Sequence, residues 1–386
     1  MKNLGLYIHI PFCIKKCFYC DFLSFENTGF EVHRRYIDAV KKEIEYYGGI
    51  YGNKYLVNSI FIGGGTPSLI DAHLIEELME SLKKYFPIAE SAEITIETNP
   101  KTLTRQKLEI YRRAGVNRLS IGVQSLYDME LKRLGRVHKA EDFIENYKTA
   151  REVGFQNINM DLMFAIPQHT QEVWEATLKQ AIDLNPEHIS FYSLQLEEGT
   201  PYFEQFERGE ILQIPDEVDR RMYHRAVELL TKAGYEHYEI SNCAKKGFEC
   251  KHNLKYWNME EYLGLGLGSH SFVEEIRFSN TKDLKLYNQA LAAFHSDPAP
   301  WVTERYKNTP KDSQSEYVFT GMRKLRGIDL IDFKVRFGKE FFEAYPEQKE
   351  MVEKYMEQNY VRIENNHMSF TLKGIDISNR ILAEFV

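Results

Sequence analysis

Three of the five cysteines in this sequence lie close together near its start, as Cys13-x3-Cys17-x2-Cys20. Thiolates are soft ligands that suit zinc and iron–sulfur clusters. A structural zinc site needs four ligands, usually in two separated pairs, and no second pair follows this group. Three cysteines on one short loop can instead ligate three irons of a [4Fe–4S] cubane and leave the fourth iron open. The spacing therefore favours a cluster with a small molecule at its open corner, and a zinc site is the alternative.

Further polar or glycine-rich positions lie at or just after the ends of strand-like runs of the sequence, with Asp161 late within its run. They are Gly63-Gly64-Gly65-Thr66, Glu97 with Asn99, Gln124, Asp161 and Gln195. The carboxyl ends of the strands form the site in βα barrels, so we expect these side chains on one rim with the cysteines. A glycine run lets the backbone approach a ligand closely, although a tight turn needs the same residues. A lone carboxylate such as Glu97 is otherwise a helix cap or a solvated charge.

The elements that must position these residues alternate regularly over the first 240 residues or so. Apolar, β-branched runs occur at residues 6–10, 59–62, 93–97, 118–123, 157–163 and 189–196. Helical patterns occur at residues 31–47, 72–85, 104–114, 140–153, 171–184 and 217–233. Strand followed by helix, repeated six times, predicts an α/β fold with a parallel sheet. Six units are fewer than the eight of a closed barrel, so we expect an open (β/α)6 partial barrel.

The last part of the chain has a different pattern. Helical stretches at residues 313–325, 330–337 and 348–359 lead into strands at 360–363 and 368–372 around an Asn365-Asn366 turn. This order predicts a small winged-helix-like domain. Its acidic and basic residues balance, whereas a winged helix that reads DNA is basic. We expect a core barrel at 1–240, a connecting segment that completes the site at 241–300, and the C-terminal domain at 301–386.

Composition narrows the class of protein. The formal net charge is −8, so nucleic acid has no global electrostatic reason to bind. The apolar run at the N-terminus is short, contains His9 and lacks a small-residue cleavage site, so it is not expected to be a signal peptide. No uncharged apolar stretch is long enough for a transmembrane helix. An odd number of cysteines, clustered as here, favours metal chemistry in a reducing compartment, and we expect a cytoplasmic protein.

These motifs together resemble the radical SAM superfamily, in which a [4Fe–4S] cluster binds S-adenosyl-L-methionine (SAM). The flanking residues resemble the oxygen-independent coproporphyrinogen III oxidase-like family over essentially the whole chain. The matching segments include residues 7–13, 63–68, 97–100, 122–125 and 159–163. The resemblance implies Cys13, Cys17 and Cys20 as cluster ligands. It implies as SAM contacts Tyr7, Gly64, Gly65, Thr66, Glu97, Gln124, Arg136 and Asp161, with Gln195 and Ser271 as less distinctive matches.

Two departures from the oxidase pattern match a shorter branch, the heme chaperone HemW branch. Phe22 stands where the oxidases carry a fourth cysteine, and no long segment precedes Cys13. That branch also has a distinctive HNxxYW segment, present here from His252 to Trp257. By resemblance, His252 is the candidate heme ligand. The alternative is a buried histidine whose hydrogen bonds organise a loop.

The resemblance implies a heme chaperone that binds heme as cargo and transfers it to an acceptor hemoprotein. The alternative is an anaerobic coproporphyrinogen III oxidase, which would decarboxylate propionates, and a radical SAM enzyme with another substrate is a third hypothesis. Whether the chain is an enzyme therefore stays open at this point. So do the identities of the acceptor and the electron donor, a homodimer, and a peripheral membrane contact.

Overall fold

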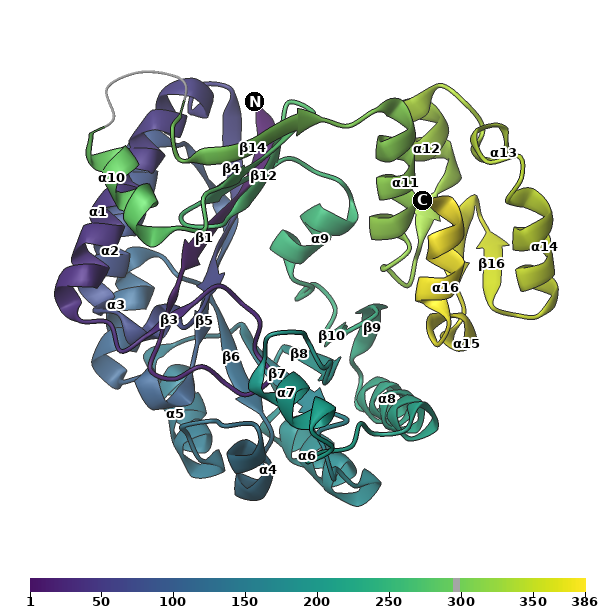
Figure 1. Ribbon diagram of the computed structural model, residues 1–386, viewed down its shortest axis with the longest axis horizontal. Helices are drawn as coiled ribbons and strands as arrows, with labels where there is room; N and C mark the ends of the chain where they lie inside the picture. Colours follow the sequence, from purple (N-terminus) through teal and green to yellow (C-terminus); the bar gives the residue numbers. More distant parts are fainter. Residues whose placement is uncertain (294–298) are drawn as a thin grey trace.

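The computed structural model describes residues 1–293 and 299–386, and its main body is an open α/β barrel (Figure 1). The expected parallel strands are β1 (Lys2–Ile10), β4 (Tyr55–Gly64), β5 (Ile88–Thr98), β6 (Arg118–Gln124), β7 (Ile158–Phe164) and β8 (His188–Ser193). The helices after them are α1 (Phe30–Tyr51), α2 (Ala72–Tyr85), α3 (Arg105–Ala114), α4 (Asp128–Arg133), α5 (Ala140–Val153), α6 (Gln171–Leu184), α7 (Pro201–Glu207) and α8 (Asp216–Lys232). The predicted repeat of strand and helix is confirmed.

The helices begin and end where local sequence signals place them. In α2, Leu74, Leu78 and Leu82 recur at helical spacing and are fully buried against the sheet. The carboxylate of Asp71 accepts a hydrogen bond from the backbone N–H of His73 at 2.9 Å and so caps the first turn. None of the helices in the described part of the chain is long and apolar enough to cross a bilayer.

The main sheet is larger than the sequence pattern indicates, because a seventh parallel strand joins it. β11 (Tyr262–Leu265) pairs with β1, and the order is β14-β13-β12-β11-β1-β4-β5-β6-β7-β8-β10-β9. Its antiparallel edges are built from β9 (Glu236–Glu239), β10 (Asn242–Ala244), β12 (His270–Val273), β13 (Ile276–Asn280) and β14 (Val302–Lys307). Since the sheet keeps two edges, the barrel is open. β11 has only 4 residues, so it is too short to show the alternating apolar pattern that reveals a strand.

A short helix, α9 (Lys251–Trp257), crosses the open side of the barrel. The strand before it, β10, lies beside β8, whereas the strand after it, β11, pairs with β1 at the other end of the parallel strands. The chain must pass between these two edges, and Figure 1 shows α9 there. The Glu93 carboxylate on β5 accepts the backbone N–H groups of Lys251 and His252, both at 3.2 Å. This negative charge stabilises the positive end of α9 and holds the helix against the barrel.

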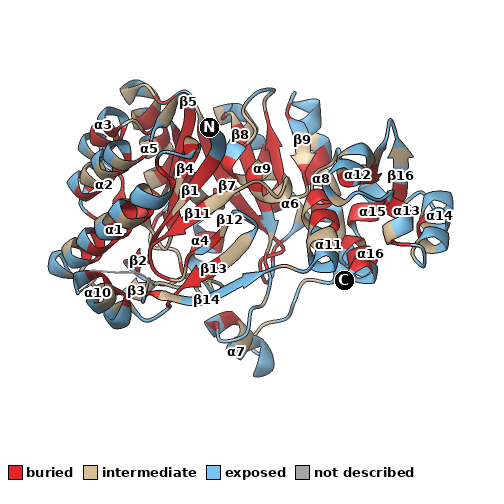
Figure 2. Cartoon of the chain, turned by 90° about the horizontal axis from the view of Figure 1, so that it is seen from above, coloured by how far each residue is buried: buried red, intermediate tan, exposed pale blue. Residues whose placement is uncertain are grey.

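The barrel strands bury apolar side chains on their outer face and present polar side chains inward. On β6, Leu119 and Ile121 are fully buried beneath the helices. In Figure 2, where buried residues are red, much of the central sheet is red. At the alternate positions, Arg118 and Ser120 line a cavity inside the barrel. Neighbouring strands contribute further polar residues to that cavity: Glu97, Asn159, Asp161 and Ser190. A closed βα barrel is typically filled by branched aliphatic side chains, so this polar interior favours a ligand-binding role.

The C-terminal domain has the helix and strand order of a winged helix, as expected. It contains α11 (Pro310–Gly321), β15 (Ile328–Asp329), α12 (Leu330–Phe337), α13 (Phe341–Ala344), α14 (Lys349–Glu357), β16 (Val361–Glu364), β17 (His367–Phe370), α15 (Leu372–Ile375) and α16 (Ser378–Leu382). Asn365 and Asn366 have φ angles of 50° and 62°, which suit the tight turn of a β-hairpin. Because β14 still pairs with β13, the chain leaves the main sheet after Lys307, later than the expected boundary at residue 301.

Backbone hydrogen bonds join this domain to the edge of the main sheet. The N–H of Ile240 donates to the carbonyl of Arg323, and the N–H of Leu325 donates to the carbonyl of Tyr238, both at 3.0 Å. The Arg323 guanidinium also lies 4.7 Å from the centre of the Trp257 ring. Since Trp257 is the last residue of α9, the C-terminal domain contacts the helix that crosses the barrel.

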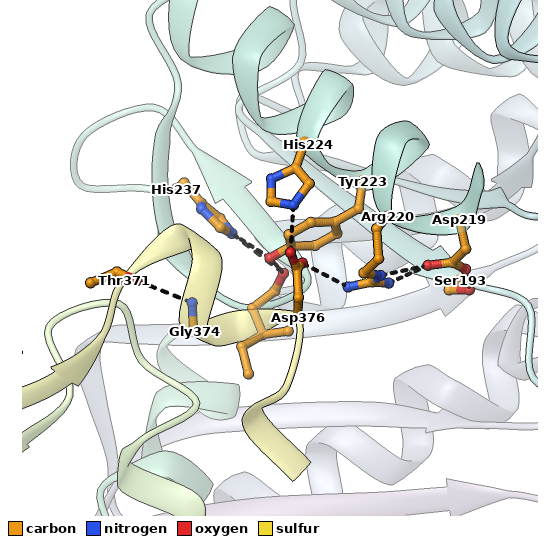
Figure 3. Close-up of polar contacts among 10 residues, drawn as sticks. Ser193, Asp219, Arg220, Tyr223, His224, His237, Thr371, Gly374 and Asp376 are labelled. Carbon is orange, nitrogen blue, oxygen red and sulfur yellow. Dashed lines mark hydrogen bonds and ion pairs between the residues drawn. The ribbon is translucent and has the colours of Figure 1, made fainter. Parts of the chain in front are cut away.

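A chain of polar side chains on α8 forms a second connection between the domains (Figure 3). Asp376, which follows α15, lies 2.9 Å from His224 Nε2 and 3.7 Å from Arg220 Nη1. Arg220 Nε donates to the carboxylate of Asp219 at 2.8 Å, and Asp219 accepts the hydroxyl of Ser193 at the end of β8. The contact therefore runs from the rim of the barrel to the C-terminal domain.

Candidate cluster and cofactor site

The three cysteines lie in the loop after β1, where other rim residues contact them. Cys13 Sγ is 3.6 Å from the hydroxyl of Thr66, and Arg136 Nη1 donates to Cys17 Sγ at 3.4 Å. The backbone N–H of Cys20 donates to the carbonyl of Cys17 at 3.2 Å, which tightens the loop. The thiols therefore meet Thr66 and Arg136, two of the SAM contacts expected from the sequence.

The chemistry of the thiols suits a cluster. Burial raises the pKa of the Cys13 thiol and raises that of Cys20 to about 11, and the neighbouring Cys17 adds to both shifts. These thiols are protonated at neutral pH without metal, so cluster assembly must release protons. No three His, Cys, Asp or Glu side chains converge on one ion anywhere in residues 1–293 and 299–386.

The glycine run lies directly against this loop. A Cβ at Gly65 would lie 2.8 Å from the carbonyl oxygen of Phe12 and 3.1 Å from Cys13 Sγ. Gly64 has a φ of +114°, and its Cβ would lie 2.6 Å from the ring of His9. Gly64 therefore needs glycine for its backbone conformation and its packing, and Gly65 needs it for packing, so a structural role explains both even without a ligand. The same bare backbone would admit a ligand close to the cysteines.

Two carboxyl groups face each other beside the glycines. Glu97 Oε2 accepts the backbone N–H of Gly64 at 3.0 Å, while Asp161 accepts Ser120 Oγ at 3.0 Å and Asn159 Nδ2 at 2.8 Å. Burial, followed by the charge of Asp161, raises the pKa of Glu97 to about 8. Burial also raises the pKa of Asp161, although its hydrogen bonds oppose the shift. Glu97 is therefore mostly protonated at neutral pH and suits a neutral polar partner such as a hydroxyl.

Arg136 and Gln124 complete this part of the rim. Arg136 Nη2 donates to the carbonyl of Gly122 at 2.5 Å, while its Nη1 reaches Cys17. Gln124 has a φ of +66°, and the pairing of β6 with β7 shifts register between Gly122 and Gln124. Bulges and left-handed backbone at non-glycine residues are enriched at functional sites because they redirect a side chain.

Some residues lie elsewhere than the sequence suggested. Asp161 is in the middle of β7 rather than near its end, so it lies below the rim and faces the barrel interior. β8 ends at Ser193, which leaves Gln195 exposed in the following loop. Ser271 accepts the N–H of Gly264 at 2.9 Å and so joins β12 to β11. The height of a residue in a barrel depends on strand register, which a single strand pattern does not specify.

A cavity of about 220 Å³ lies below the rim, inside the barrel. Its wall is formed by Tyr7, Phe61, Glu97, Arg118, Ser120, Asn159, Asp161, Ser190, Tyr192, His252, Asn253 and Tyr256. Three expected SAM contacts thus share a cavity with the expected heme ligand, whereas the cysteines are outside its wall. Tyr192 is 39% exposed and marks the mouth of the cavity.

His252 is a buried, neutral side chain in this wall. Its Nδ1 is 2.9 Å from the hydroxyl of Ser59, and its Nε2 is 2.9 Å from the hydroxyl of Tyr256. Burial lowers the pKa of His252 to about 3, with the charges of Lys255 and Arg118 adding to the shift. A neutral imidazole is the form that ligates iron. Because both ring nitrogens already have partners, iron ligation would require one of these bonds to be exchanged.

Sequence analysis missed the polar residues at the inner positions of the strands. Glu93 caps α9, Arg118 and Ser190 line the cavity, and Tyr192 lies at its mouth. The available signal was a polar residue at every second position of otherwise apolar runs, which indicates a polar face. The two remaining cysteines are buried, as expected for ordinary core residues, and Cys250 precedes α9.

Two protein families match segments of this chain. Residues 7–181 match the Radical SAM superfamily, and residues 308–377 match the HemN C-terminal domain. A heme chaperone HemW of Bacillus subtilis (strain 168) is 34% identical over 382 residues, covering 98% of this chain and 98% of that protein. A heme chaperone HemW of Escherichia coli (strain K12) is 41% identical over 338 residues, covering 86% of each.

A solved structure shares the fold over the whole chain. It is the coproporphyrinogen III oxidase HemN from Escherichia coli, a radical SAM enzyme, with a TM-score of 0.85. The match covers 100% of this chain and 90% of that one at 24% sequence identity. At this identity the likeness establishes the fold alone.

Proposed function

The chain belongs to the HemW family of the radical SAM superfamily, and from this premise we propose that it is a heme chaperone that binds heme and transfers it to an acceptor hemoprotein. The observation that carries the proposal is the match to curated heme chaperones along nearly the full length of both proteins. An exposed Phe22, in place of the fourth cysteine of the oxidase pattern, supports the same choice.

The proposed cofactors are a [4Fe–4S] cluster and SAM. Cys13, Cys17 and Cys20 would hold the cluster, and the fourth iron would be open to SAM. When bound, the pair supplies an electron source and a sulfonium whose C–S bond can be cleaved by reduction. The proposed SAM contacts are Tyr7, Gly64, Gly65, Thr66, Glu97, Gln124, Arg136 and Asp161.

These side chains have separate roles in the proposed site. The Arg136 guanidinium donates a hydrogen bond to Cys17 Sγ and so fixes the position of this thiol. The bare backbone at Gly64 and Gly65 leaves room for the methionine end of SAM beside the cysteine loop. Protonated Glu97 can exchange its bond to the Gly64 N–H for one to a polar group of SAM.

Heme is proposed as cargo, with His252 as its axial ligand. The cavity of about 220 Å³ beside His252 is smaller than the roughly 300–1,000 Å³ of pockets that enclose drug-sized ligands. A whole tetrapyrrole would therefore reach His252 only after α9 moves. Release of the Tyr256 hydroxyl would then free Nε2 for the iron. We further propose the cytoplasm as the location of this protein.

A heme titration of the cluster-loaded protein tests this function. We expect a shifted Soret band that weakens in His252→Ala, because the variant lacks the ligand. Tyr256→Phe should keep or strengthen binding, because it removes the hydroxyl that competes for Nε2. Equal binding by the wild type and His252→Ala would reject His252, and absent binding by the wild type would reject the chaperone.

The same preparation separates the chaperone from the oxidase, whose fold the chain shares. Anaerobic incubation with coproporphyrinogen III, SAM and a reductant should yield no protoporphyrinogen. Substantial decarboxylation would make the oxidase the better assignment. Size-exclusion chromatography and vesicle sedimentation of the heme-loaded protein decide whether heme delivery involves a homodimer or a membrane surface.

A further inference from the structure

Arg118 is a buried cation inside the barrel that has no partner among the described residues. It is the first residue of β6, is 1% exposed, and lines the cavity. Its Nε and Nη1 atoms are buried without a hydrogen-bond partner, and no carboxylate of the described residues lies within ion-pair distance. Buried arginines are rarely found unpaired, because unsatisfied donors on a charged group destabilise the folded protein. An unpaired one in a cavity wall therefore indicates a missing ligand.

The carboxylates near Arg118 are already engaged elsewhere. Glu93 binds the N-terminus of α9, and Asp161 accepts hydrogen bonds from Ser120 and Asn159. Glu97 binds the N–H of Gly64 and is mostly protonated at neutral pH. The fields of Glu93 and Asp161 help to keep Arg118 charged despite its burial. None of these groups, however, satisfies its N–H donors.

The shape of the cavity restricts the missing partner. A guanidinium presents parallel N–H groups that match the two oxygens of a carboxylate. The cavity is small, and aromatic rings of Phe61, Tyr192 and Tyr256 form part of the wall that it shares with Arg118. This suits a short apolar arm that ends in a carboxylate and belongs to a larger ligand, whose body is admitted to His252 when α9 moves.

SAM also carries a carboxylate, but its proposed place is at the other end of β6. Arg118 begins the strand, whereas Gly122, which contacts Arg136 beside the cysteine loop, comes four residues later. Four residues of strand span roughly 13 Å. A carboxylate bound beside the cluster would therefore not satisfy Arg118.

We propose that Arg118 binds a carboxylate arm of the tetrapyrrole cargo, of the propionate type, at the inner end of this cavity. This inference rests on the proposed function and adds to it the group that recognises the acid side chains of heme. Arg118 would then select heme from tetrapyrroles that lack free carboxylates.

The test compares heme with heme whose propionates are methyl esters, by Soret titration of the cluster-loaded protein. We expect the wild type to bind the free acid at least about tenfold more tightly than the diester. Arg118→Gln should lower the affinity for the free acid to that of the diester and leave diester binding unchanged. Arg118→Lys keeps the positive charge but lacks the parallel N–H groups of the guanidinium, so it should retain part of the preference for the free acid. Arg105→Gln, at a half-exposed surface arginine, is the matched control and should behave as the wild type.

Other outcomes separate the two proposals. A wild type that binds both compounds equally overturns the carboxylate site and leaves the chaperone standing. A wild type that binds neither compound overturns the proposed function itself. If Arg118→Gln lowers the affinity for SAM while the preference for free heme persists, the carboxylate is that of SAM and the inference is wrong. Should Arg118→Gln fail to fold, the comparison of the two ligands on the wild type and Arg118→Lys still decides the question.

Discussion

Single residues at the rim combine soft ligands, a bare backbone and a nearby cation. Cys13 and Cys17 lie beside Thr66 and Arg136, and Gly65 lets the next strand approach Cys13. Burial raises the pKa of the Cys13 and Cys20 thiols, so both hold their protons until a metal binds. At the scale of single residues, the site consists of the cysteines and the hydroxyl, guanidinium and glycine backbone that contact them.

The first prediction concerns the cluster ligands. Cys17→Ala should lower the iron of anaerobically reconstituted protein from about four atoms per chain toward zero and abolish the cluster absorption. Two thiols cannot hold three corners of a cubane. Iron analysis and electron paramagnetic resonance of the reduced protein measure the effect. Cys243→Ala removes a buried thiol far from the loop and should keep the iron, so equal iron loss in both variants would contradict the assignment.

At the scale of elements, buried polar anchors hold helices in place against the sheet. Glu93 on β5 binds the N-terminus of α9, and Glu43 on α1 reaches the edge formed by β11 and β13. Neither anchor is near its partner in sequence. Each ties a surface element to the strands that carry the site, and burial raises the pKa of Glu43 to about 7, so the protonation of Glu43 affects the stability of the fold.

The second prediction follows from the pKa of Glu43. The carboxyl accepts the N–H of Gly266 at 2.7 Å and the amide of Asn280 at 2.6 Å, yet burial raises its pKa to about 7. The folded protein therefore holds a proton that the unfolded chain releases near pH 4.5. Stability from this group is complete below that pH and is lost as pH rises through about 7.

Glu43 should thus lower the free energy of unfolding by up to ~1.4 kcal/mol per pH unit between about pH 5 and 7. Glu43→Gln should remove that part of the slope in urea denaturation curves. Glu45→Gln, on the exposed side of the same helix, should leave the slope unchanged. A slope that is the same in the wild type and Glu43→Gln would reject this reasoning.

At the scale of the whole molecule, the small C-terminal domain packs against one side of the barrel. The C-terminal domain contacts β9, α8 and the end of α9, and α9 closes the open side of the barrel. Movement of α9, which the proposed heme binding requires, would therefore disturb this contact. A movement of α9 would therefore reach the C-terminal domain, although none of the residues that line the cavity belongs to that domain.

The third prediction measures the polar part of this contact. Asp376→Asn should lower the free energy of unfolding by at most about 1 kcal/mol, because the pairs with His224 and Arg220 are partly exposed. The loss should shrink at high salt, which screens such pairs. Urea denaturation at low and high salt checks both statements, and Glu384→Gln at an exposed position is the control. A loss well above 2 kcal/mol, independent of salt, would show that the contact is not electrostatic.

Sequence alone determined what depends on neighbouring residues along the chain. Cys13, Cys17 and Cys20 lie on one loop, so their spacing is visible in the sequence. The bounds of α2, α5, α6 and α12 follow from periodicity and caps within a few residues. The order of helices and strands in the C-terminal domain could likewise be predicted, because each of these elements has its own local pattern. Such signals need no knowledge of the rest of the fold.

Only the tertiary structure decided which distant residues meet inside the barrel. Strand register sets Asp161 below the rim, parallel pairing brings in β11, and the return of the chain between the sheet edges places α9 and His252 over the interior. The isolation of Arg118 is visible only when every neighbour is placed. The physical reason is that pairing and burial depend on contacts between residues far apart in sequence, which no local pattern encodes.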